Sequence, residues 1–364
     1  MRPTPAVPTS GSAAARPSPP RLAGLAGTAA LLAGLALPAL AAPAEGAPAG
    51  YHVLFASVSC PSAKVCEAVG YYGTGTFAYR STDGGSSWHA QALPGPVAEP
   101  SAAELFSVSC SSVTTCEAVG YHASAALALR TTNGGTSWAV QGLPAGTAYL
   151  EAVSCPSATT CTAVGAGAAL TTSTGGARWR RAKLPGVAMS VSCASTTTCV
   201  TVTGSSLGAS VPNGVYATSD GGRSWRSETS GFGGLAPALL AGYRVSCAGA
   251  EDCEAFGAAL YGTVNGGRTW AAQRPPLASG ELTGTCASSA VCVALNEPSG
   301  LALRTLDGGR SWTTGSAPRS DGSLNSVSCA TPQVCVAVGA NNTTTIGTVL
   351  RTTNGGVTWR LGPA

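Results

Sequence analysis

The sequence predicts an all-β fold, a β-propeller of seven four-stranded antiparallel blades, and three observations support this prediction. A box that ends in Gly-Gly-x-x-Trp occurs seven times in the 364 residues, and each of the seven Trp residues closes one copy. The 14 Cys residues form seven pairs, all with the spacing C-x5-C. The first Cys of successive pairs are separated by 50, 45, 38, 54, 39 and 43 residues. A regular unit of roughly 40–50 residues is typical of a propeller blade.

Each repeat has the same order of segments. It begins with V-S-C or a similar triplet, continues through five turn residues to C-x-A-V-G, and reaches the box after a variable loop and a further apolar run. These apolar runs are short and are bounded by Gly, Pro, Asn and Asp, which is typical of β-strands. We therefore expect four strands per repeat, A to D, with the Cys pair joining A to B and the box joining C to D.

The repeats also set the expected blade boundaries. Every repeat starts at strand A and ends at strand D, so no spare strand remains to build a blade from both ends of the chain. We therefore expect side-chain packing between the first and last blades to close the ring. A two-sheet sandwich is the alternative fold, but it would not repeat one blade-sized unit seven times. The predicted blades span approximately 51–94, 101–144, 148–185, 187–229, 241–275, 280–318 and 322–364.

Residues 1–41 differ from the repeats and predict a secretory signal peptide. Basic residues precede an apolar stretch over 22–40, and Ala39-Leu40-Ala41 provides a cleavage site. Residues 42–50 then form a short linker, and residues 51–364 form the propeller. An uncleaved membrane anchor is the alternative, although the stretch is Gly-rich and only marginally long enough to span a bilayer. We expect bacterial-type export, to the cell envelope or the exterior, with no integral membrane span after cleavage.

The charge balance argues against a nucleic-acid partner. The full sequence has 20 Lys and Arg against 16 Asp and Glu, and three Arg leave with the signal peptide, which reduces the basic residues to 17. Nucleic-acid-binding proteins gather positive charge on one surface, and the only basic cluster here is Arg178, Arg180 and Arg181. The apolar fraction of 44% is sufficient for a buried core.

The Cys pairs predict disulfides within each repeat. An even number of Cys in an exported chain is typical of disulfide bonding. Zinc sites usually combine two close ligand pairs or add His, and the chain has only three His residues, so we expect no metal and no cofactor. The predicted bridges are Cys60–Cys66, Cys110–Cys116, Cys155–Cys161, Cys193–Cys199, Cys247–Cys253, Cys286–Cys292 and Cys329–Cys335.

The box resembles the Asp-box, or BNR repeat, S/T-x-D-x-G-x-T/S-W, of the sialidase-like β-propellers, and this resemblance covers all seven repeats. Within that class the chain resembles secreted bacterial BNR proteins and photosystem II assembly factor-like proteins, which implies a binding or assembly scaffold in which the box is structural. Thr174 replaces the acid in the third box, which should be the weakest. The matching residues are Asp83, Asn133, Asp220, Asn265, Asp307 and Asn354, followed by Trp88, Trp138, Trp179, Trp225, Trp270, Trp312 and Trp359.

The chemistry of the box indicates a turn. Asp or Asn accepts hydrogen bonds from backbone N–H groups, and a Gly-Gly pair adopts positive φ without steric cost. The Trp covers the hairpin with a large apolar face. Four Arg residues precede boxes, and we expect them to pack along the Trp face or to pair with a box acid: Arg80, Arg130, Arg304 and Arg351.

Ligand binding is expected on the rim opposite the boxes. The Cys loops and the boxes share one rim, called the box rim below, whereas the variable B–C and D–A connections share the other, the variable rim. Loops on a rigid scaffold are where binding residues usually lie. Aromatic side chains there suit stacking on a sugar or a peptide, although ordinary loop packing is the simpler interpretation of any one of them. The candidates are Tyr71, Tyr72, Tyr121, His122, Tyr149 and Tyr243.

The supply of catalytic groups is small. Three of the five Asp residues are in boxes. A glycosidase needs two carboxylates on either side of the scissile bond. The variable rim offers four, but the sequence singles out no pair among Glu99, Glu104, Glu281 and Glu297. Three further acids follow a second Cys and belong to the box rim: Glu67, Glu117 and Glu254. We therefore name no catalytic residue.

The sequence thus predicts an exported, monomeric and non-enzymatic propeller that binds or assembles an unidentified protein or glycan partner. The alternative is a glycoside hydrolase of the sialidase or endoglucanase propeller type. An assembly factor for a complex of the cell envelope is a third class. These functions would all use the variable rim.

Overall fold

The computed structural model describes residues 53–73, 75–98, 103–204, 214–228, 243–276, 280–296, 299–319, 322–341 and 347–362. Every described residue belongs to the compact unit Ala41–Ala364. The predicted signal peptide (1–41) and linker (42–50) lie outside the described residues. Where the chain is described, its helices are all too short or too polar to span a bilayer.

The described residues form six antiparallel sheets, five of them four-stranded. The first two, β1-β2-β3-β4 and β5-β6-β7-β8, come from the first two repeats and are separated by the short helix α1 (Gly95–Ala98). The first sheet contains Leu54–Ser59, Cys66–Tyr72, Gly75–Ser81 and His89–Ala90. The second contains Ala103–Cys110, Cys116–His122, Ala125–Thr131 and Ala139–Val140.

The prediction of seven separate blades is wrong, because the third and fourth repeats share one six-stranded sheet. This sheet has the order β14-β13-β12-β11-β10-β9, so the propeller is six-bladed, with one double-sized blade that contains two of the disulfides. Its strands are β9 (Leu150–Ser154), β10 (Cys161–Thr172), β11 (Arg180–Cys193), β12 (Cys199–Gly204), β13 (Gly214–Thr218) and β14 (Arg226–Ser227).

The cause of this merger is the missing connection between the predicted blades 148–185 and 187–229. Strand D of the third repeat continues through Leu184-Pro185-Gly186 directly into strand A of the fourth, so both are parts of β11. The first part of β11 pairs with β10, and the part from Val187 onward pairs with β12. Gly186 has a φ of 77°, which reorients the strand within this segment.

The remaining three sheets return to the four-stranded pattern. They are β15 to β18 (Arg244–Cys247, Asp252–Phe256, Leu260–Val264, Ala271–Gln273), β19 to β22 (Leu282–Cys286, Cys292–Asn296, Leu301–Thr305, Thr313–Ser316) and β23 to β26 (Leu324–Cys329, Cys335–Gly339, Thr348–Thr352, Arg360–Leu361). Each Cys pair forms the predicted disulfide at the turn between the first two strands of its repeat.

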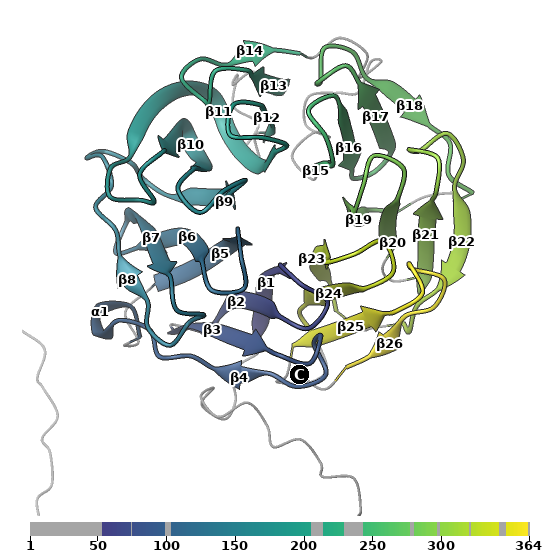
Figure 1. Ribbon diagram of the computed structural model, residues 1–364, viewed down its shortest axis with the longest axis horizontal. Helices are drawn as coiled ribbons and strands as arrows, with labels where there is room; N and C mark the ends of the chain where they lie inside the picture. Colours follow the sequence, from purple (N-terminus) through teal and green to yellow (C-terminus); the bar gives the residue numbers. More distant parts are fainter. Residues whose placement is uncertain are drawn as a thin grey trace, which may run out of the picture. The chain divides into compact units, whose positions relative to one another are not determined.

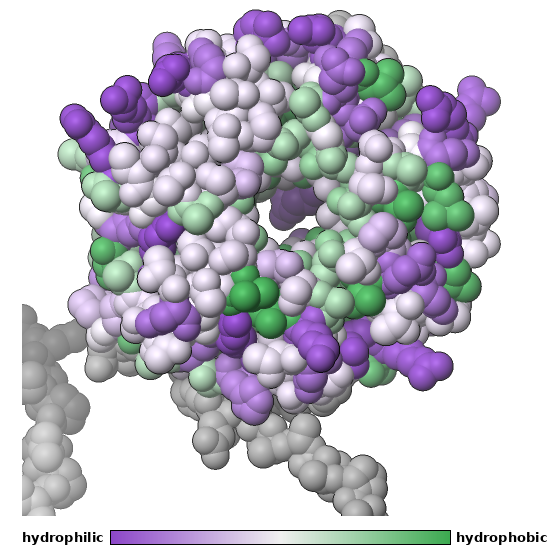
Figure 2. Space-filling view, viewed as in Figure 1, coloured by the Kyte–Doolittle hydropathy of each residue, from purple (hydrophilic) through white to green (hydrophobic). Residues whose placement is uncertain are grey.

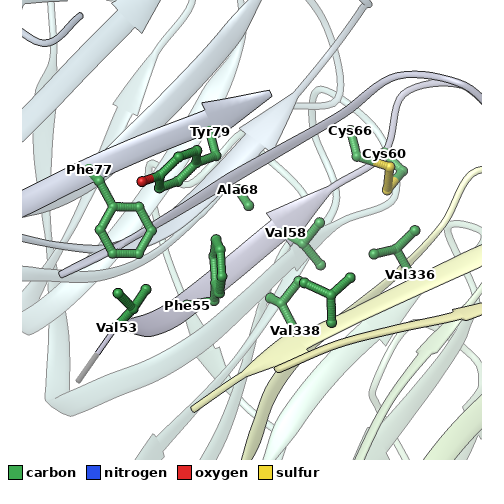
Figure 3. Packing of buried hydrophobic residues seen from close by; sticks show 11 residues of the cluster. Val53, Phe55, Val58, Cys60, Cys66, Ala68, Phe77, Tyr79, Val336 and Val338 are labelled. Atoms are coloured by element: carbon green, nitrogen blue, oxygen red, sulfur yellow. A yellow bond between two sulfur atoms is a disulfide. The ribbon is translucent and has the colours of Figure 1, made fainter. Parts of the chain in front are cut away.

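The sheets of the unit 41–364 are arranged around a common centre, with the first strand of each repeat innermost (Figure 1). Apolar clusters fill the spaces between neighbouring sheets. The cluster between the first and last sheets joins Val53, Phe55 and Val58 to Val336 and Val338, as Figure 3 shows. All strands of the first sheet come from the first repeat and all strands of the last from the seventh, so packing of side chains joins the two ends of the chain.

A belt of serine hydroxyls links the innermost strands of neighbouring repeats. The Ser of each V-S-C triplet accepts a hydrogen bond from the backbone N–H of the first Cys in the next repeat, at 2.9–3.0 Å. Ser328 makes this bond to Cys60 and so connects the last repeat to the first. In the sixth repeat Thr285 replaces the Ser. The acceptors Ser59, Ser109, Ser154, Ser192, Ser246 and Ser328 receive the backbone N–H groups of Cys110, Cys155, Cys193, Cys247, Cys286 and Cys60, in that order.

The box is a hydrogen-bonded turn in all seven repeats. A Ser or Thr hydroxyl before each box accepts the N–H of the second Gly at 2.7–3.1 Å. The acid or amide accepts further N–H groups; in Asp307, the hydrogen bond from the Ser311 hydroxyl is the main reason that the pKa falls to about 2. Thr174 keeps one such bond, because its hydroxyl accepts the N–H of Arg178 at 3.0 Å.

The box tryptophans connect repeats through a Trp-x-x-Gln pattern. The indole N–H groups of Trp138, Trp179 and Trp312 donate to Gln91, Gln141 and Gln273 of the preceding repeat, at 2.8, 2.8 and 2.7 Å. The indole N–H groups of Trp88, Trp225 and Trp359 are buried without an acceptor among the described residues. Their preceding repeats carry Gly362, Ala182 and Gly315 in place of the Gln.

Of the two roles expected for the four arginines that precede boxes, pairing with a box acid does not occur among the described residues. Each instead extends to the next repeat, where its guanidinium lies against the first Gly of that box (Arg80 at Gly134, Arg130 at Gly175, Arg304 at Gly355, Arg351 at Gly84). Arg80 and Arg130 also form ion pairs with the buried carboxylates of Glu67 and Glu117, at 3.2 and 3.4 Å. The arginines therefore join blades rather than stabilise their own box.

Replacement of Gln141 by Leu should destabilise the protein. The buried Trp179 N–H would lose its acceptor, and an unsatisfied buried donor costs about 1–3 kcal/mol. Urea unfolding monitored by Trp fluorescence would measure the loss in the free energy of unfolding. Gln141→Leu made in a Trp179→Phe background is the matched control and should have a smaller effect; an equal effect in both backgrounds would contradict the role of this hydrogen bond.

Candidate binding site at the mouth of the central channel

The innermost strands enclose a central channel with a cavity of about 580 Å³. The opening at the centre of the ring is visible in the space-filling view (Figure 2). Each innermost strand runs from the variable rim towards its disulfide on the box rim, so the first residues of these strands lie at the variable-rim mouth. The mouth is therefore built from residues close to the predicted binding loops.

Irregular pairing in the innermost strands supplies side chains to the channel. In five repeats the register between the first and second strands shifts by one residue near the mouth. A β-bulge of this kind redirects a side chain that regular alternation would place elsewhere. The additional residues, which all line the cavity, are Ala56, Phe106, Glu151, Met189 and Asn325.

An aromatic cluster lies on one side of the mouth. Phe106 packs between Tyr71 and Tyr121, with ring centroids 6.1 and 5.7 Å apart. The Tyr121 hydroxyl donates a hydrogen bond to Glu104 Oε1 at 3.1 Å. Tyr71, Glu104 and Phe106 face the cavity. The cluster thus combines a large apolar surface with a carboxylate that is held in place by a phenol.

The charges of the mouth are mostly negative. Burial raises the pKa of Glu151, the Arg244 guanidinium lowers it, and the Glu104 carboxylate raises it again. The surrounding protein lowers the pKa of Arg244, while the carboxylates Glu151 and Glu281 oppose this shift. Arg244 also donates to the backbone oxygen of Met189 at 3.3 Å. Two carboxylates, Glu151 and Glu281, therefore share one arginine at this end of the channel, and Glu104 adds a third negative charge beside Glu151.

The structure brings three of the six predicted binding residues close to one another and separates the others. Tyr71 and Tyr121 belong to the aromatic cluster. Tyr149 lies beside Glu151, and the pKa of the Tyr149 phenol is raised mainly by burial and in addition by the Glu151 carboxylate. Tyr72 stacks on Phe77 in the joint between the first and last sheets. His122 ends β6, half-buried. Tyr243 is 0% exposed and its hydroxyl accepts the N–H of Ala259, so it is a core residue.

Sequence reasoning missed Phe106, Glu151, Met189 and Arg244. The first three are bulge residues, and a bulge has no marker in the sequence of these strands. Arg244 did have a signal, because it stands where four other repeats have Ser, three residues before the first Cys. Of the acids considered on the variable rim, Glu104 and Glu281 lie at the mouth, whereas Glu99 and Glu297 lie outside the described residues.

The described parts of the chain contain no group of three or more His, Cys, Asp or Glu residues placed to hold a metal ion. The three carboxylates of the mouth, Glu104, Glu151 and Glu281, can accept hydrogen bonds and carry negative charge. Their chemistry suits recognition of a cation or of donor groups.

Comparison with solved structures supports the propeller fold. The chain is similar to Ycf48 bound to a D1 peptide, with a TM-score of 0.63, 17% identity and coverage of 86% of this chain and 99% of the other. It is similar to Ycf48 from Cyanidioschyzon merolae (TM-score 0.61, 16% identity, coverage 84% and 97%) and to the WD40 repeats of RRP9 (0.61, 11%, 82% and 92%). No protein-family model and no curated protein matches the sequence. The fold class is therefore that of the Ycf48 and WD40 propellers.

Two substitutions should shift the pKa of Glu151 in opposite directions. Arg244→Met removes the neighbouring positive charge and should raise this pKa further above its ordinary value, whereas Glu104→Gln removes a negative charge and should lower it. Carboxyl carbon NMR of protein labelled at Glu would record both titrations. A pKa that stays the same in both variants would contradict the charge coupling at the mouth.

Proposed function

We propose that this protein is a non-enzymatic scaffold that binds a segment of a protein partner at the variable-rim mouth of its channel. The observation that supports this most is the cluster of Tyr71, Phe106 and Tyr121 beside the carboxylates of Glu104 and Glu151. Aromatic residues with few charges at the centre and polar groups around them are the usual composition of a protein-binding hot spot. The mouth would thus accept an apolar side chain next to a positive charge.

The comparisons favour a polypeptide over a glycan as the partner. Ycf48, which has the same fold, has been solved with a bound D1 peptide. We extend to this chain only the class of partner, a polypeptide, and derive its chemistry from the mouth itself. The excess of carboxylates over Arg244 favours a segment that contains Lys or Arg.

The disulfides support a location of the protein outside the cytoplasm. Seven disulfides in one chain indicate an oxidising, extracytoplasmic compartment. We propose that residues 1–41 are the export signal and that the partner is located in the cell envelope or outside the cell. Analysis of the N-terminus of the protein recovered from outside the cytoplasm tests this, and a protein that retains residues 1–41 there would contradict it.

Selection from a random peptide library displayed on phage tests the binding function. We expect enrichment of peptides that place Lys or Arg near an apolar residue, and their affinity should fall at least about tenfold for the Phe106→Ala/Tyr121→Ala variant, since loss of an aromatic anchor costs about 1–3 kcal/mol. Val140→Ala, on an exposed outer strand, is the control and should bind like the wild type. Peptides that bind all three proteins equally, or the absence of enrichment, would contradict the proposed site.

A glycoside hydrolase is the second candidate, and one contact favours it. Tyr121 and Glu104 form a Tyr–Glu pair at 3.1 Å, the combination that a sialidase uses as nucleophile and base. Two features oppose this function. Burial and the Glu104 carboxylate raise the pKa of Tyr121, which keeps the phenol protonated and weakly nucleophilic. Among the described residues, Arg244 is also the single arginine that lines the cavity, whereas a sialidase needs a cluster.

Turnover assays separate the two candidates. The mature protein should leave a panel of sialosides and β-glucans intact. Hydrolysis that disappears in both Tyr121→Phe and Glu104→Gln would overturn the non-enzymatic scaffold and establish the hydrolase. Hydrolysis that persists in both variants would also overturn the scaffold and would place catalysis away from the mouth.

A further inference from the structure

The fifth repeat keeps a buried acid but lacks the arginine that accompanies it in the first two repeats. Three repeats have another residue at the arginine position (Thr171, Ala217 and Gly262), and of these only the fifth has the acid. The acid follows the second Cys and pairs across the sheet with the residue directly before the Ser or Thr of the box turn: Glu67 opposes Arg80, and Glu117 opposes Arg130. In the fifth repeat the same pairing sets Glu254 opposite Gly262. The acid is therefore retained, but its cation is absent.

The two complete pairs show what the arginine does. The Arg80 guanidinium contacts Glu67 at 3.2 Å through Nη1 and donates through Nη2 to the backbone oxygen of Val113 at 2.6 Å. Arg130 makes the same two contacts, with Glu117 and with the backbone oxygen of Ala158. Val113 and Ala158 are both the third residue after the first Cys of the following repeat. Each guanidinium thus bridges a buried carboxylate and a turn carbonyl of the next blade.

A hollow occupies the corresponding position beside Gly262. It has a volume of about 550 Å³ and is lined by Glu254, Gly262 and Gln273 on one side and by Ser289 and Gly308 on the other. Ser289 is the third residue after Cys286, so its position matches those of Val113 and Ala158. The acid and the turn residue that hold a guanidinium in the first two repeats are therefore both present around an open space.

Glu254 is buried without a cationic partner among the described residues. Glu254 is 6% exposed, and its two carboxylate oxygens accept hydrogen bonds from Gln273 Nε2 at 2.9 and 2.8 Å. The other charged residues that line the hollow are Asp252, Arg274 and Arg310, and none of them forms an ion pair with Glu254. Burial raises the pKa of Glu254 to about 8, and Asp252 adds to this shift.

The Gln273 side chain has a second position available. In the first two repeats the equivalent Gln91 and Gln141 direct their amide nitrogens to the backbone oxygens of Gly134 and Gly175, at 3.3 and 3.5 Å. The arginine there forms the ion pair with the carboxylate, although Gln91 also hydrogen-bonds to Glu67. The matching acceptor for Gln273 is the backbone oxygen of Gly308, which also lines the hollow. Rotation of this amide would release Glu254 for another donor.

We propose that the hollow between the fifth and sixth repeats is a binding site for a guanidinium group, which takes the position of the missing arginine between Glu254 and the backbone of Ser289. The ligand is an arginine side chain of a partner polypeptide or a small free guanidine. When the cation binds, the Glu254 carboxyl loses its proton to solvent and the carboxylate accepts N–H groups of the guanidinium. The site lies on the box rim, away from the channel mouth, and does not depend on the function proposed for that mouth.

Titration with methylguanidinium chloride tests the site without a partner. The side-chain amide of Gln273 should show saturable NMR shifts, whereas tetramethylammonium chloride at equal ionic strength should leave them unchanged. Because the proton competes with the cation, the affinity should rise roughly tenfold per pH unit from pH 6 and level off above the pKa of Glu254, about 8. Absence of saturation, or an affinity independent of pH over this range, would overturn the proposal.

Three variants assign the binding to this site. Gly262→Arg supplies the guanidinium from the chain itself, and Glu254→Gln removes the charge, so both should abolish binding. Glu251→Gln removes an exposed acid two residues before Cys253 and should bind like the wild type. If Gly262→Arg fails to fold, the comparison of methylguanidinium binding by Glu254→Gln and by Glu251→Gln still tests whether Glu254 forms the site. Methylguanidinium binding that survives in Glu254→Gln would overturn the proposal.

The source of the guanidinium is distinguished with capped amino acids. Acetyl-arginine amide should bind more tightly than methylguanidinium if the hollow receives an arginine side chain, because the methylene stem also contacts its walls. Acetyl-citrulline amide, which has the same shape without the charge, should not bind. If methylguanidinium binds and acetyl-arginine amide does not, the ligand is a small free guanidine, and a partner's arginine is ruled out.

Discussion

The hydrogen bond between a serine hydroxyl and the backbone N–H of the next repeat is the interaction on which the rest of the ring depends. It occurs where the innermost strand meets its disulfide, in the V-S-C triplet that appears with little change along the chain. Much of the remaining contact between adjacent blades is apolar, and apolar contacts alone have no fixed register. The hydrogen bond to the serine hydroxyl fixes the position of one innermost strand along its neighbour. The strands that line the channel are therefore held in a defined arrangement.

Much of the fold could be predicted because the same pattern of Cys pair and box occurs in seven repeats. The Cys spacing predicted the seven hairpins, and the Gly-Gly-x-x-Trp box predicted the turns that carry Asp83 or Asn133. The count of blades could not be predicted in the same way. Pro185-Gly186 has the composition of a loop, yet one strand continues through these residues, because β10 and β12 pair with the two parts of β11 on either side of them.

The candidate sites were harder to predict than the fold, since they arise where repeats differ. The bulges that turn Phe106 and Glu151 into the channel depend on pairing with the second strand, which local sequence does not specify. Arg244 and Gly262 are visible only when each repeat is aligned on its Cys residues and read as a departure from the others. Arg244 places a cation at a position where four of the other repeats have a serine, and Gly262 removes a cation from the contact between two blades. In a repeat protein, such single departures deserve the first functional test.

The continuous strand β11 has a consequence for how the ring opens. Each of the other repeats forms a sheet of its own. The third and fourth repeats are instead parts of one sheet, because the continuous strand β11 pairs with β10 before Gly186 and with β12 after it. Their amide hydrogens should exchange with solvent as one cooperative unit twice the size of any other, which makes the double-sized blade the slowest part of the ring to open.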